Sequence, residues 1–212
     1  MPPARNYGPA APGGANGNLY FSLDIGALHL VLYNSETPDD TGSVDAAEVA
    51  WLEADLAAAV SANATWLIAG AHRPLYCTNG AWNTSDKDCS LFAGVMRAQA
   101  ETTFNKHKVD LVLGAHMHGY ERTQAVNGGK VVTAAANGTT YVRAGAPVYI
   151  VNGAGGNREG NEDPHGDAPW SVPGAHYSTT GFGLITVSAS RMQYDFVDAA
   201  SGAVLDTAVW TK

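Results

Sequence analysis

Two segments of this 212-residue sequence end alike, and they decide the expected fold: Trp66-Leu67-Ile68-Ala69-Gly70-Ala71-His72 and Leu111-Val112-Leu113-Gly114-Ala115-His116. Each begins with a short continuous apolar run, which is typical of a strand buried on both faces of a sheet. Helical patterns precede them, over residues 44–60 and 91–107. Strands that alternate with helices in this way predict parallel crossover connections within an α/β layered core.

The rest of the chain extends this pattern on both sides. Residues 19–23 and 28–33 read as neighbouring strands, and the helix over 44–60 has a capping pattern formed by Asp45 and Glu48. Beyond residue 130 the helical periodicity stops. Strands are expected at 130–133, 147–151, 183–187, 192–197 and 204–209, with a long Gly-rich loop over 153–181. Loops of that length in a compact domain are usually functional.

The repeated strand ends place histidines where a site is expected. Ligands bind outside the carboxyl ends of strands in open α/β sheets, which is where His72 and His116 fall. His118 follows two residues after His116, and alternate side chains of an extended segment share a face. One histidine at a strand end is usually a hydrogen-bonding residue, but three together favour a metal site. Imidazoles alone do not identify the metal.

Composition limits the partners that this chain can bind. Its formal charge of −8 argues against sequence-independent binding of nucleic acid, which needs a dense Lys and Arg surface. A small phosphorylated substrate stays compatible, because a metal supplies local positive charge. No apolar run approaches the ~18 residues that span a bilayer. We therefore expect neither a nucleic-acid nor a membrane partner.

Two cysteines, Cys77 and Cys89, flank one short polar loop. This spacing favours a local disulfide, and hence an oxidising compartment, over a metal site. Three glycosylation sequons point the same way; they lie at Asn63, Asn83 and Asn137. We expect a secreted or a lysosomal or vacuolar-type location, although residues 1–17 show no apolar signal-peptide core.

The histidine segments resemble the motifs of a known family. Residues 114–122 (GAHMHGYER) resemble the G-H-x-H-x-Y-E-R motif of purple acid phosphatases, with Gly-Ala-His in place of Gly-His. Residues 71–77 (AHRPLYC) resemble the family's upstream histidine motif in its animal-like form. The resemblance covers roughly residues 16–210, and its further matches are 51–56, 147–151, 155–160 and 177–183.

This resemblance implies a fold and a metal centre. The fold is a metallophosphoesterase β-sandwich flanked by helices in αββα layers. Residues 18–135 would form the C-terminal half of the catalytic domain and residues 136–212 its β-rich C-terminal segment, after an irregular segment over 1–17. By the same resemblance, His72 and His116 bind a divalent metal (Zn, Mn or Fe) and His118 binds Fe(III). A metal-bound hydroxide is then expected to attack a phosphate monoester.

Other ligands of the family are absent from this sequence. The family also uses two Asp, one Tyr and one Asn, from motifs of the form G-D-x-G, G-D-x-x-Y and G-N-H-[DE], and none of these motifs occurs here. We therefore expect the chain to lack the N-terminal strands and to hold at most one metal, weakly. The partner that this implies is the missing N-terminal half or another chain.

Further residues have expected roles. Tyr120, Arg158, His165 and His176 are candidates for substrate contacts, although a solvated loop position is the simpler interpretation of the last three. Glu121 and Arg122 are expected to have structural or supporting roles. His29 and His107 are expected to be ordinary strand and helix-end residues.

Three functions stay open at this point. The first is an acid phosphatase that hydrolyses phosphate monoesters at a dinuclear centre, with this chain supplying part of the site. The second is a non-catalytic fragment or a metal-binding or interaction module with the same fold. The third is a phosphodiesterase or nucleotide hydrolase, because the fold does not fix the substrate.

Overall fold

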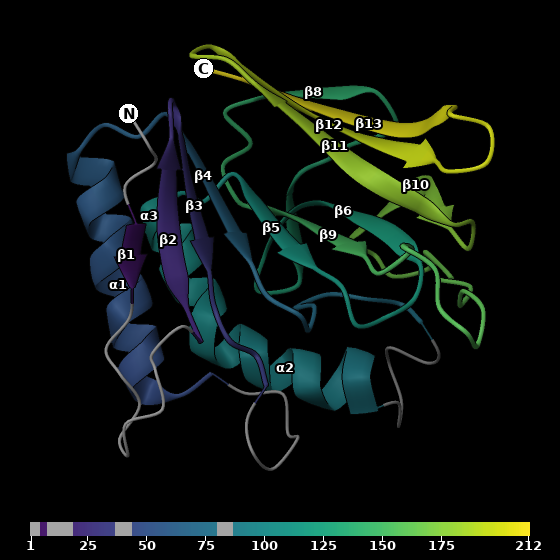
Figure 1. The fold of residues 1–212 in the computed structure, drawn as a ribbon, viewed down its shortest axis with the longest axis horizontal. Helices are drawn as coiled ribbons and strands as arrows, with labels where there is room; N and C mark the ends of the chain where they lie inside the picture. The colour runs from purple at the N-terminus through teal and green to yellow at the C-terminus, as the bar shows by residue number, and fades with distance from the viewer. Residues whose placement is uncertain (1–4, 8–18, 37–43, 80–86) are drawn as a thin grey trace.

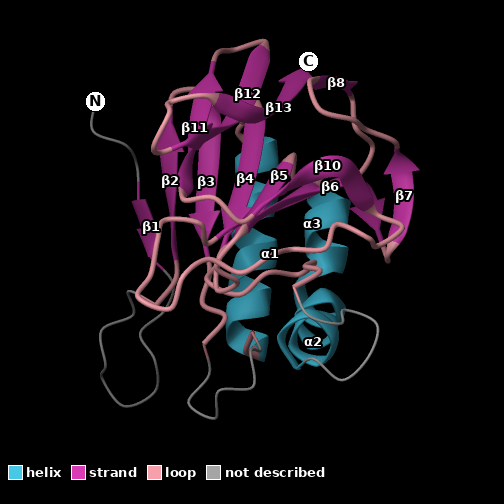
Figure 2. Ribbon diagram, turned by 90° about the vertical axis from the view of Figure 1, so that its right-hand side faces the viewer, coloured by secondary structure: helices cyan, strands magenta, loops and turns pink. Residues whose placement is uncertain are grey.

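The structure, a computed structural model, describes residues 5–7, 19–36, 44–79 and 87–212. They form two β-sheets packed face to face, with helices on the outer face of the larger sheet (Figures 1 and 2). The expected α/β fold with two sheets is confirmed. The described residues form three layers, helix, sheet and sheet, of the four that the resemblance implies.

The parallel centre of the larger sheet comes from the apolar runs of the sequence. β3 (Leu28–Leu32), β4 (Trp66–Gly70), β5 (Leu111–Gly114) and β9 (Val148–Asn152) lie side by side in this order, all parallel. Every residue of β4 is buried, as expected for a strand covered on both faces. The carboxyl ends of these strands therefore meet at one edge of the sheet, which we call the carboxyl edge.

Antiparallel strands complete the larger sheet, whose order is β1-β2-β3-β4-β5-β9-β6-β10 with β7 paired to β6. Their bounds are β1 (Arg5–Tyr7), β2 (Phe21–Ile25), β6 (Tyr120–Asn127), β7 (Lys130–Thr133) and β10 (Ser171–Tyr177). β1 lies within the segment that was expected to be irregular, and it pairs with β2. The sequence patterns also gave no sign of β6 or β10.

The smaller sheet has four strands in the order β11-β12-β13-β8. Their bounds are β8 (Thr139–Val142), β11 (Gly181–Val187), β12 (Arg191–Asp198) and β13 (Val204–Thr211). Three of these were expected from the sequence, and β8 was not. Because β9 and β10 join the larger sheet, the chain crosses between the two sheets more than once after residue 135.

The helices pack against the larger sheet in two stretches. The first is α1 (Ala46–Ser61), and the second runs through η1 (Lys87–Phe92), α2 (Ala93–Met96), η2 (Arg97–Glu101) and α3 (Thr102–His107). Asp45 caps α1 as expected, because its side chain accepts a hydrogen bond of 2.8 Å from the backbone N–H of Glu48. The Glu48 carboxylate accepts a hydrogen bond from the backbone N–H of Asn34, which joins α1 to the chain just beyond β3.

Two apolar cores hold the layers together. One lies between the helices and the larger sheet and includes Leu52, Leu56 and Phe104. The other lies between the sheets and includes Trp66, Phe196 and Trp210. No helix in the described part of the chain is both long and apolar enough to cross a bilayer.

Candidate metal site at the carboxyl edge

His72 and His116 meet just beyond the ends of two neighbouring parallel strands. His72 follows β4 and His116 follows β5, and the two segments are joined by a backbone hydrogen bond of 2.8 Å from Ala115 N–H to the His72 carbonyl. The His72 Nε2 and His116 Nδ1 atoms lie 3.0 Å apart, with the rings edge to face. The repeated sequence pattern therefore brings the two imidazoles together.

Backbone geometry beside His116 makes this approach possible. A Cβ atom at Gly114 would lie 2.8 Å from the Cα atom of Pro74, so only glycine allows the two strand-end segments to come this close. His116 itself has a φ of 55°, which lies in the left-handed region that non-glycine residues seldom adopt. Such strain concentrates at functional positions.

Charged side chains surround the other side of the His116 ring. Its Nε2 atom lies 3.2 Å from Oδ1 of Asp88 and 3.3 Å from Nη1 of Arg73. Arg73 binds the same Asp88 oxygen at 2.7 Å, and its Nε contacts both oxygens of Glu36 at 3.1 and 3.2 Å. The guanidinium of Arg73 is therefore shared between two carboxylates.

None of these three charged residues was assigned to the site from the sequence. Arg73 directly follows His72, Glu36 lies just beyond β3, and Asp88 is the neighbour of Cys89. A signal for Glu36 existed, because it follows a parallel strand whose end meets the same edge. The contact between Asp88 and His116, 28 residues apart, depends on the path of the intervening chain.

The pKa of His72 is lowered from its ordinary value. His72 is exposed as a residue, but partial burial of its ring is the main cause, and the neighbouring His116 and Arg73 add to it, against an opposing effect of Glu36. The neutral imidazole, which carries a lone pair, is therefore the favoured form at neutral pH. This is the form that binds metals.

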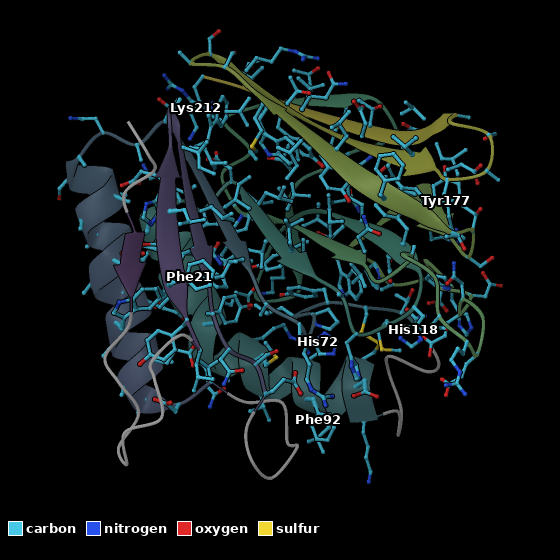
Figure 3. The ribbon with its side chains drawn as sticks, viewed as in Figure 1. Phe21, His72, Phe92, His118, Tyr177 and Lys212 are labelled. Carbon is cyan, nitrogen blue, oxygen red and sulfur yellow. A yellow bond between two sulfur atoms is a disulfide. The ribbon has the colours of Figure 1, made fainter. Side chains whose placement is uncertain are left out.

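His118 lies further along the same loop. Figure 3 shows it, with His72, at the edge where the parallel strands end. Its backbone N–H donates to Oε2 of Glu162 at 3.2 Å, and its carbonyl accepts from the Glu162 N–H at 2.9 Å. These contacts join the loop to the Gly-rich segment that follows β9.

The facing nitrogens of His72 and His116 are the donors whose spacing bears on metal binding. Two nitrogens at ~2.0–2.1 Å from one tetrahedral ion lie roughly 3.3 Å apart, and the facing atoms of His72 and His116 lie 3.0 Å apart. No group of three His, Cys, Asp or Glu side chains suited to a metal ion is found among the residues that the structure describes.

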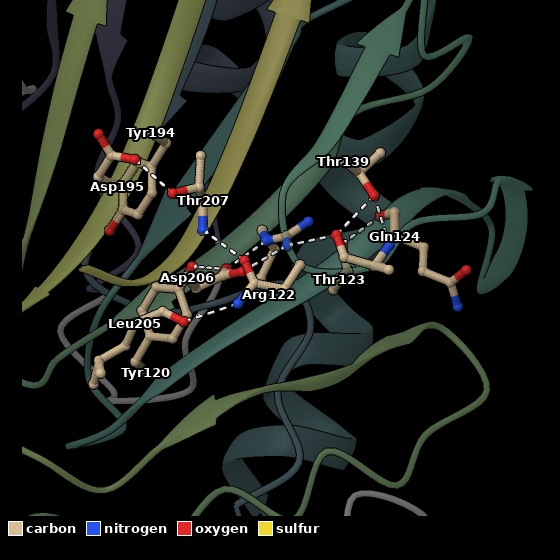
Figure 4. A network of polar contacts seen from close by, with 12 residues as sticks. Tyr120, Arg122, Thr123, Gln124, Thr139, Tyr194, Asp195, Leu205, Asp206 and Thr207 are labelled. Atoms are coloured by element: carbon tan, nitrogen blue, oxygen red, sulfur yellow. Dashed lines mark hydrogen bonds and ion pairs between the residues drawn. The ribbon is translucent and has the colours of Figure 1, made fainter. Parts of the chain in front are cut away.

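The Tyr-Glu-Arg part of the motif lies inside the molecule. Arg122 is fully buried between the sheets and binds Asp206 of β13 through Nε at 2.6 Å and Nη2 at 2.7 Å (Figure 4). The Tyr120 hydroxyl donates to Asp206 at 2.6 Å. The candidate role of Tyr120 in substrate contact is therefore corrected, because its side chain is fully buried and its hydroxyl is engaged. Arg122 has the structural role that was expected.

Glu121 joins the cysteine loop to β10. Its carboxylate accepts hydrogen bonds from Thr78 N–H at 2.8 Å and from the Ser171 hydroxyl at 3.1 Å. Burial raises the pKa of Glu121 to about 7, against the opposing effect of these hydrogen bonds. Its contacts lie within the fold, in agreement with a supporting role.

The remaining candidates for substrate contact lie on the segment after β9. Arg158 and His165 are exposed. His176 is part of β10, where it pairs with Glu121, and its ring packs so close to Gly166 that a Cβ there would clash with it. Among the described residues, no recorded hydrogen bond joins these three side chains to His72 or His116.

The structure joins Cys77 and Cys89 in a disulfide. Both cysteines are buried with Met117, the residue between His116 and His118, and with Val151 of β9. The disulfide therefore packs directly beneath the histidine loop. Of the three sequons, Asn63 and Asn137 are exposed, and Asn83 lies outside the described residues.

Comparisons with known proteins bear on the family and the fold of the chain. Residues 146–207 match the family model described as iron/zinc purple acid phosphatase-like protein C. Over 166 residues the chain is 33% identical to Purple acid phosphatase 18 of Arabidopsis thaliana, covering 77% of this chain and 33% of the relative. It is 28% identical to Acid phosphatase type 7 of Danio rerio, over 95% of this chain and 48% of the relative.

A solved structure supports the fold. The purple acid phosphatase from yellow lupin (Lupinus luteus) seeds superposes with a TM-score of 0.77 at 21% identity, over 95% of this chain and 34% of the lupin chain. This likeness concerns the fold alone. The chain spans between a third and a half of the length of the two curated relatives named above.

Proposed function

Because this chain belongs to the purple acid phosphatase family, we propose that it is part of a metal-dependent acid phosphatase and supplies His72, His116 and His118 to the metal site. The observation that carries the proposal is the meeting of His72 Nε2 and His116 Nδ1, 3.0 Å apart, beyond the ends of β4 and β5. The proposed substrates are small phosphate monoesters.

The chain's own residues have distinct roles in this proposal. When bound, the metal supplies a Lewis acid that neutralises charge on phosphate oxygens. His72 and His116 present their facing nitrogens to it, and the lowered pKa of His72 supports a neutral ring at that residue. Arg73 is occupied by Glu36 and Asp88, so it orders the site and does not bind substrate. Arg158, His165 and His176 are the proposed contacts for the phosphate or its leaving group.

We propose a dinuclear centre of Fe(III) and a divalent ion only for an assembly that contains further ligands. The donors described here fit one ion, so the second needs carboxylate, Tyr and Asn ligands from another polypeptide segment. That segment, either an N-terminal half or a separate chain, is the proposed partner. The chain alone then binds at most one metal and has little hydrolytic activity.

Metal content and turnover test this proposal. The purified chain is loaded with Zn²⁺, and bound metal is measured by mass spectrometry together with p-nitrophenyl phosphate hydrolysis at pH 5. We expect no more than one ion per chain, loss of that ion in His72→Ala, and negligible turnover. Robust turnover by the isolated chain would overturn its proposed incompleteness, and a chain that binds no metal would overturn the assignment of the histidines.

A second function is favoured by one observation. The described residues contain no group of three side chains that could hold a metal ion, which suits the non-catalytic interaction module among the alternatives. The two functions differ when the ligand-bearing segment of a relative is supplied. Turnover restored by that segment supports the phosphatase, and hydrolysis of bis-p-nitrophenyl phosphate in preference to the monoester would favour a diesterase.

We propose an oxidising location for the chain, either secreted or of lysosomal or vacuolar type. The disulfide between Cys77 and Cys89 and the exposure of the sequon residues Asn63 and Asn137 support it. Peptide mass spectrometry of the chain isolated from its source should find the disulfide oxidised and at least one sequon glycosylated. Reduced cysteines and unmodified sequons would contradict this location.

A further inference from the structure

We propose that Asp88 is a positioning residue for His116: it holds the ring with its Nε2 protonated, so that the Nδ1 lone pair faces His72. This inference deepens the proposed function and rests on it for the presence of a metal. It concerns a residue outside the histidine motifs, and it follows from the contacts on the two ring nitrogens of His116.

Each nitrogen of the His116 ring has its own set of neighbours. Nδ1 faces His72 Nε2 at 3.0 Å, and Nε2 faces Asp88 Oδ1 at 3.2 Å and Arg73 Nη1 at 3.3 Å. A neutral imidazole carries a proton on one nitrogen only, and the contacts of one nitrogen therefore decide what the other can do.

The two neighbours of Nε2 favour opposite tautomers. A guanidinium only donates, so Arg73 favours a lone pair on Nε2, which puts the proton on Nδ1. A carboxylate accepts, so Asp88 favours a proton on Nε2 and frees the Nδ1 lone pair. In the first tautomer, Nδ1–H donates to His72. In the second, both facing nitrogens can offer lone pairs to one metal ion.

Asp88 is held in place for this role from two directions. Arg73 binds it at 2.7 Å, and the side chain of Arg73 is itself only 7% exposed, between Glu36 and the ring of Phe92. Cys89, the next residue, is anchored by its disulfide to Cys77. The carboxylate therefore keeps its position at the edge of the His116 ring.

The position of Asp88 distinguishes a support from a ligand. Its recorded contact is with Nε2, which is the nitrogen on the other side of the ring from the facing pair. Carboxylates that accept from the second nitrogen of a ligating histidine fix its tautomer and raise its basicity. Removing such a partner typically weakens metal binding by roughly 10–100-fold.

The test compares Asp88→Ala with wild type and with a matched control. Asp24→Ala is the control, because Asp24 also contacts a histidine, His29, at 2.7 Å, but at the opposite edge of the sheet. Zn²⁺ affinity is measured by competition with a chromophoric chelator. The His116 tautomer is measured on the metal-free chain at pH 8 by long-range ¹H–¹⁵N NMR. Asp88→Asn serves as the conservative variant, because its amide oxygen keeps an acceptor.

We expect Asp88→Ala to bind Zn²⁺ 10–100-fold more weakly and to shift His116 toward the Nδ1-protonated tautomer. Asp88→Asn should recover part of both effects, and Asp24→Ala should show neither. Unchanged affinity and tautomer in a folded Asp88→Ala chain would overturn the inference while the proposed function stands. A wild-type chain without Zn²⁺ affinity, whose tautomer still depends on Asp88, would overturn the proposed function and keep the positioning role.

Discussion

Histidines at the two edges of the same sheet are held in opposite ways. At the amino end of β3, His29 is buried, and both of its ring nitrogens contact carboxylates: Nδ1 lies 2.7 Å from Asp24 and Nε2 lies 3.0 Å from Asp55. At the carboxyl edge, His72 and His116 turn nitrogens toward each other. A pocket of about 430 Å³ opens beside His29.

The difference shows how ring partners separate a structural histidine from a candidate ligand. His29 has a carboxylate on each nitrogen, so it is suited to carry a proton and has no lone pair to offer. The hydroxyl of Ser22 also donates to Asp55 at 2.9 Å, which completes a closed polar network between β2, β3 and α1. At the carboxyl edge, the facing nitrogens of His72 and His116 can be bridged by a proton or by a metal ion.

Replacing one histidine from each edge gives the largest expected contrast. His29→Ala leaves the carboxylate of Asp55 buried without its cationic partner and should lower the free energy of unfolding by about 3 kcal/mol. His72 is exposed, so His72→Ala should change it by less than ~0.5 kcal/mol. Urea denaturation of both variants measures the difference. Equal losses in the two variants would remove the distinction between the edges.

Zn²⁺ should stabilise the folded chain through the carboxyl edge and not through His29. A ligand at 100 times its dissociation constant stabilises the folded chain by about 2.7 kcal/mol. We expect this increment in wild type and in His29→Ala, and its loss in His72→Ala. Thermal unfolding with and without Zn²⁺ gives the increments. An increment that survives in His72→Ala would place the metal elsewhere.

The pH dependence of stability tests the amino edge alone. Burial of His29 lowers its pKa, but hydrogen bonds and charges of Asp55 and Asp24 outweigh this effect and raise the pKa above the ordinary 6.5. The folded chain then holds a proton that the unfolded chain has released. The stabilisation is complete below pH 6.5 and is lost as the pH rises through the raised pKa.

The expected slope from this one proton is at most ~1.4 kcal/mol per pH unit, with stability falling as the pH rises. His29→Gln removes the titrating group, so the difference in unfolding free energy between wild type and His29→Gln should shrink above pH 6.5. Urea titrations between pH 5.5 and 9 measure it. A difference that stays constant over this range would show that folding does not raise the pKa of His29.

The smallest expected effect separates the two partners of His29. Asp24 has a side chain that is 57% exposed, whereas that of Asp55 is 4% exposed. Water screens the outer contact, so Asp24→Ala should cost no more than about 0.5–1 kcal/mol. Asp55→Ala should cost more, because it leaves His29 buried beside one exposed carboxylate. A larger loss for Asp24→Ala than for Asp55→Ala in urea denaturation would reverse this ranking.

Local sequence patterns predicted the elements that obey them. The apolar runs at β4 and β5, the periodicity of α1 and its Asp45 cap all have causes within a few residues, and the structure contains them. β6, β8 and β10 lack such patterns. β6 is almost entirely buried although it contains Glu121, Arg122 and Thr123, because Asp206, Thr78 and Ser171 satisfy two of these side chains from distant segments.

The site divides in the same way. The sequence by itself determined where His72, His116 and His118 fall, because equivalent ends of parallel strands must meet at one edge of a sheet. Only the tertiary structure decided which nitrogens face each other and that Asp88, Arg73 and Glu36 surround His116. The physical reason is that strand ends are set by local periodicity. The partners of a side chain depend on segments that are distant in the sequence and adjacent in the fold. Here the disulfide, the close contact of Gly114 with Pro74 and the packing of distant strands bring these segments together.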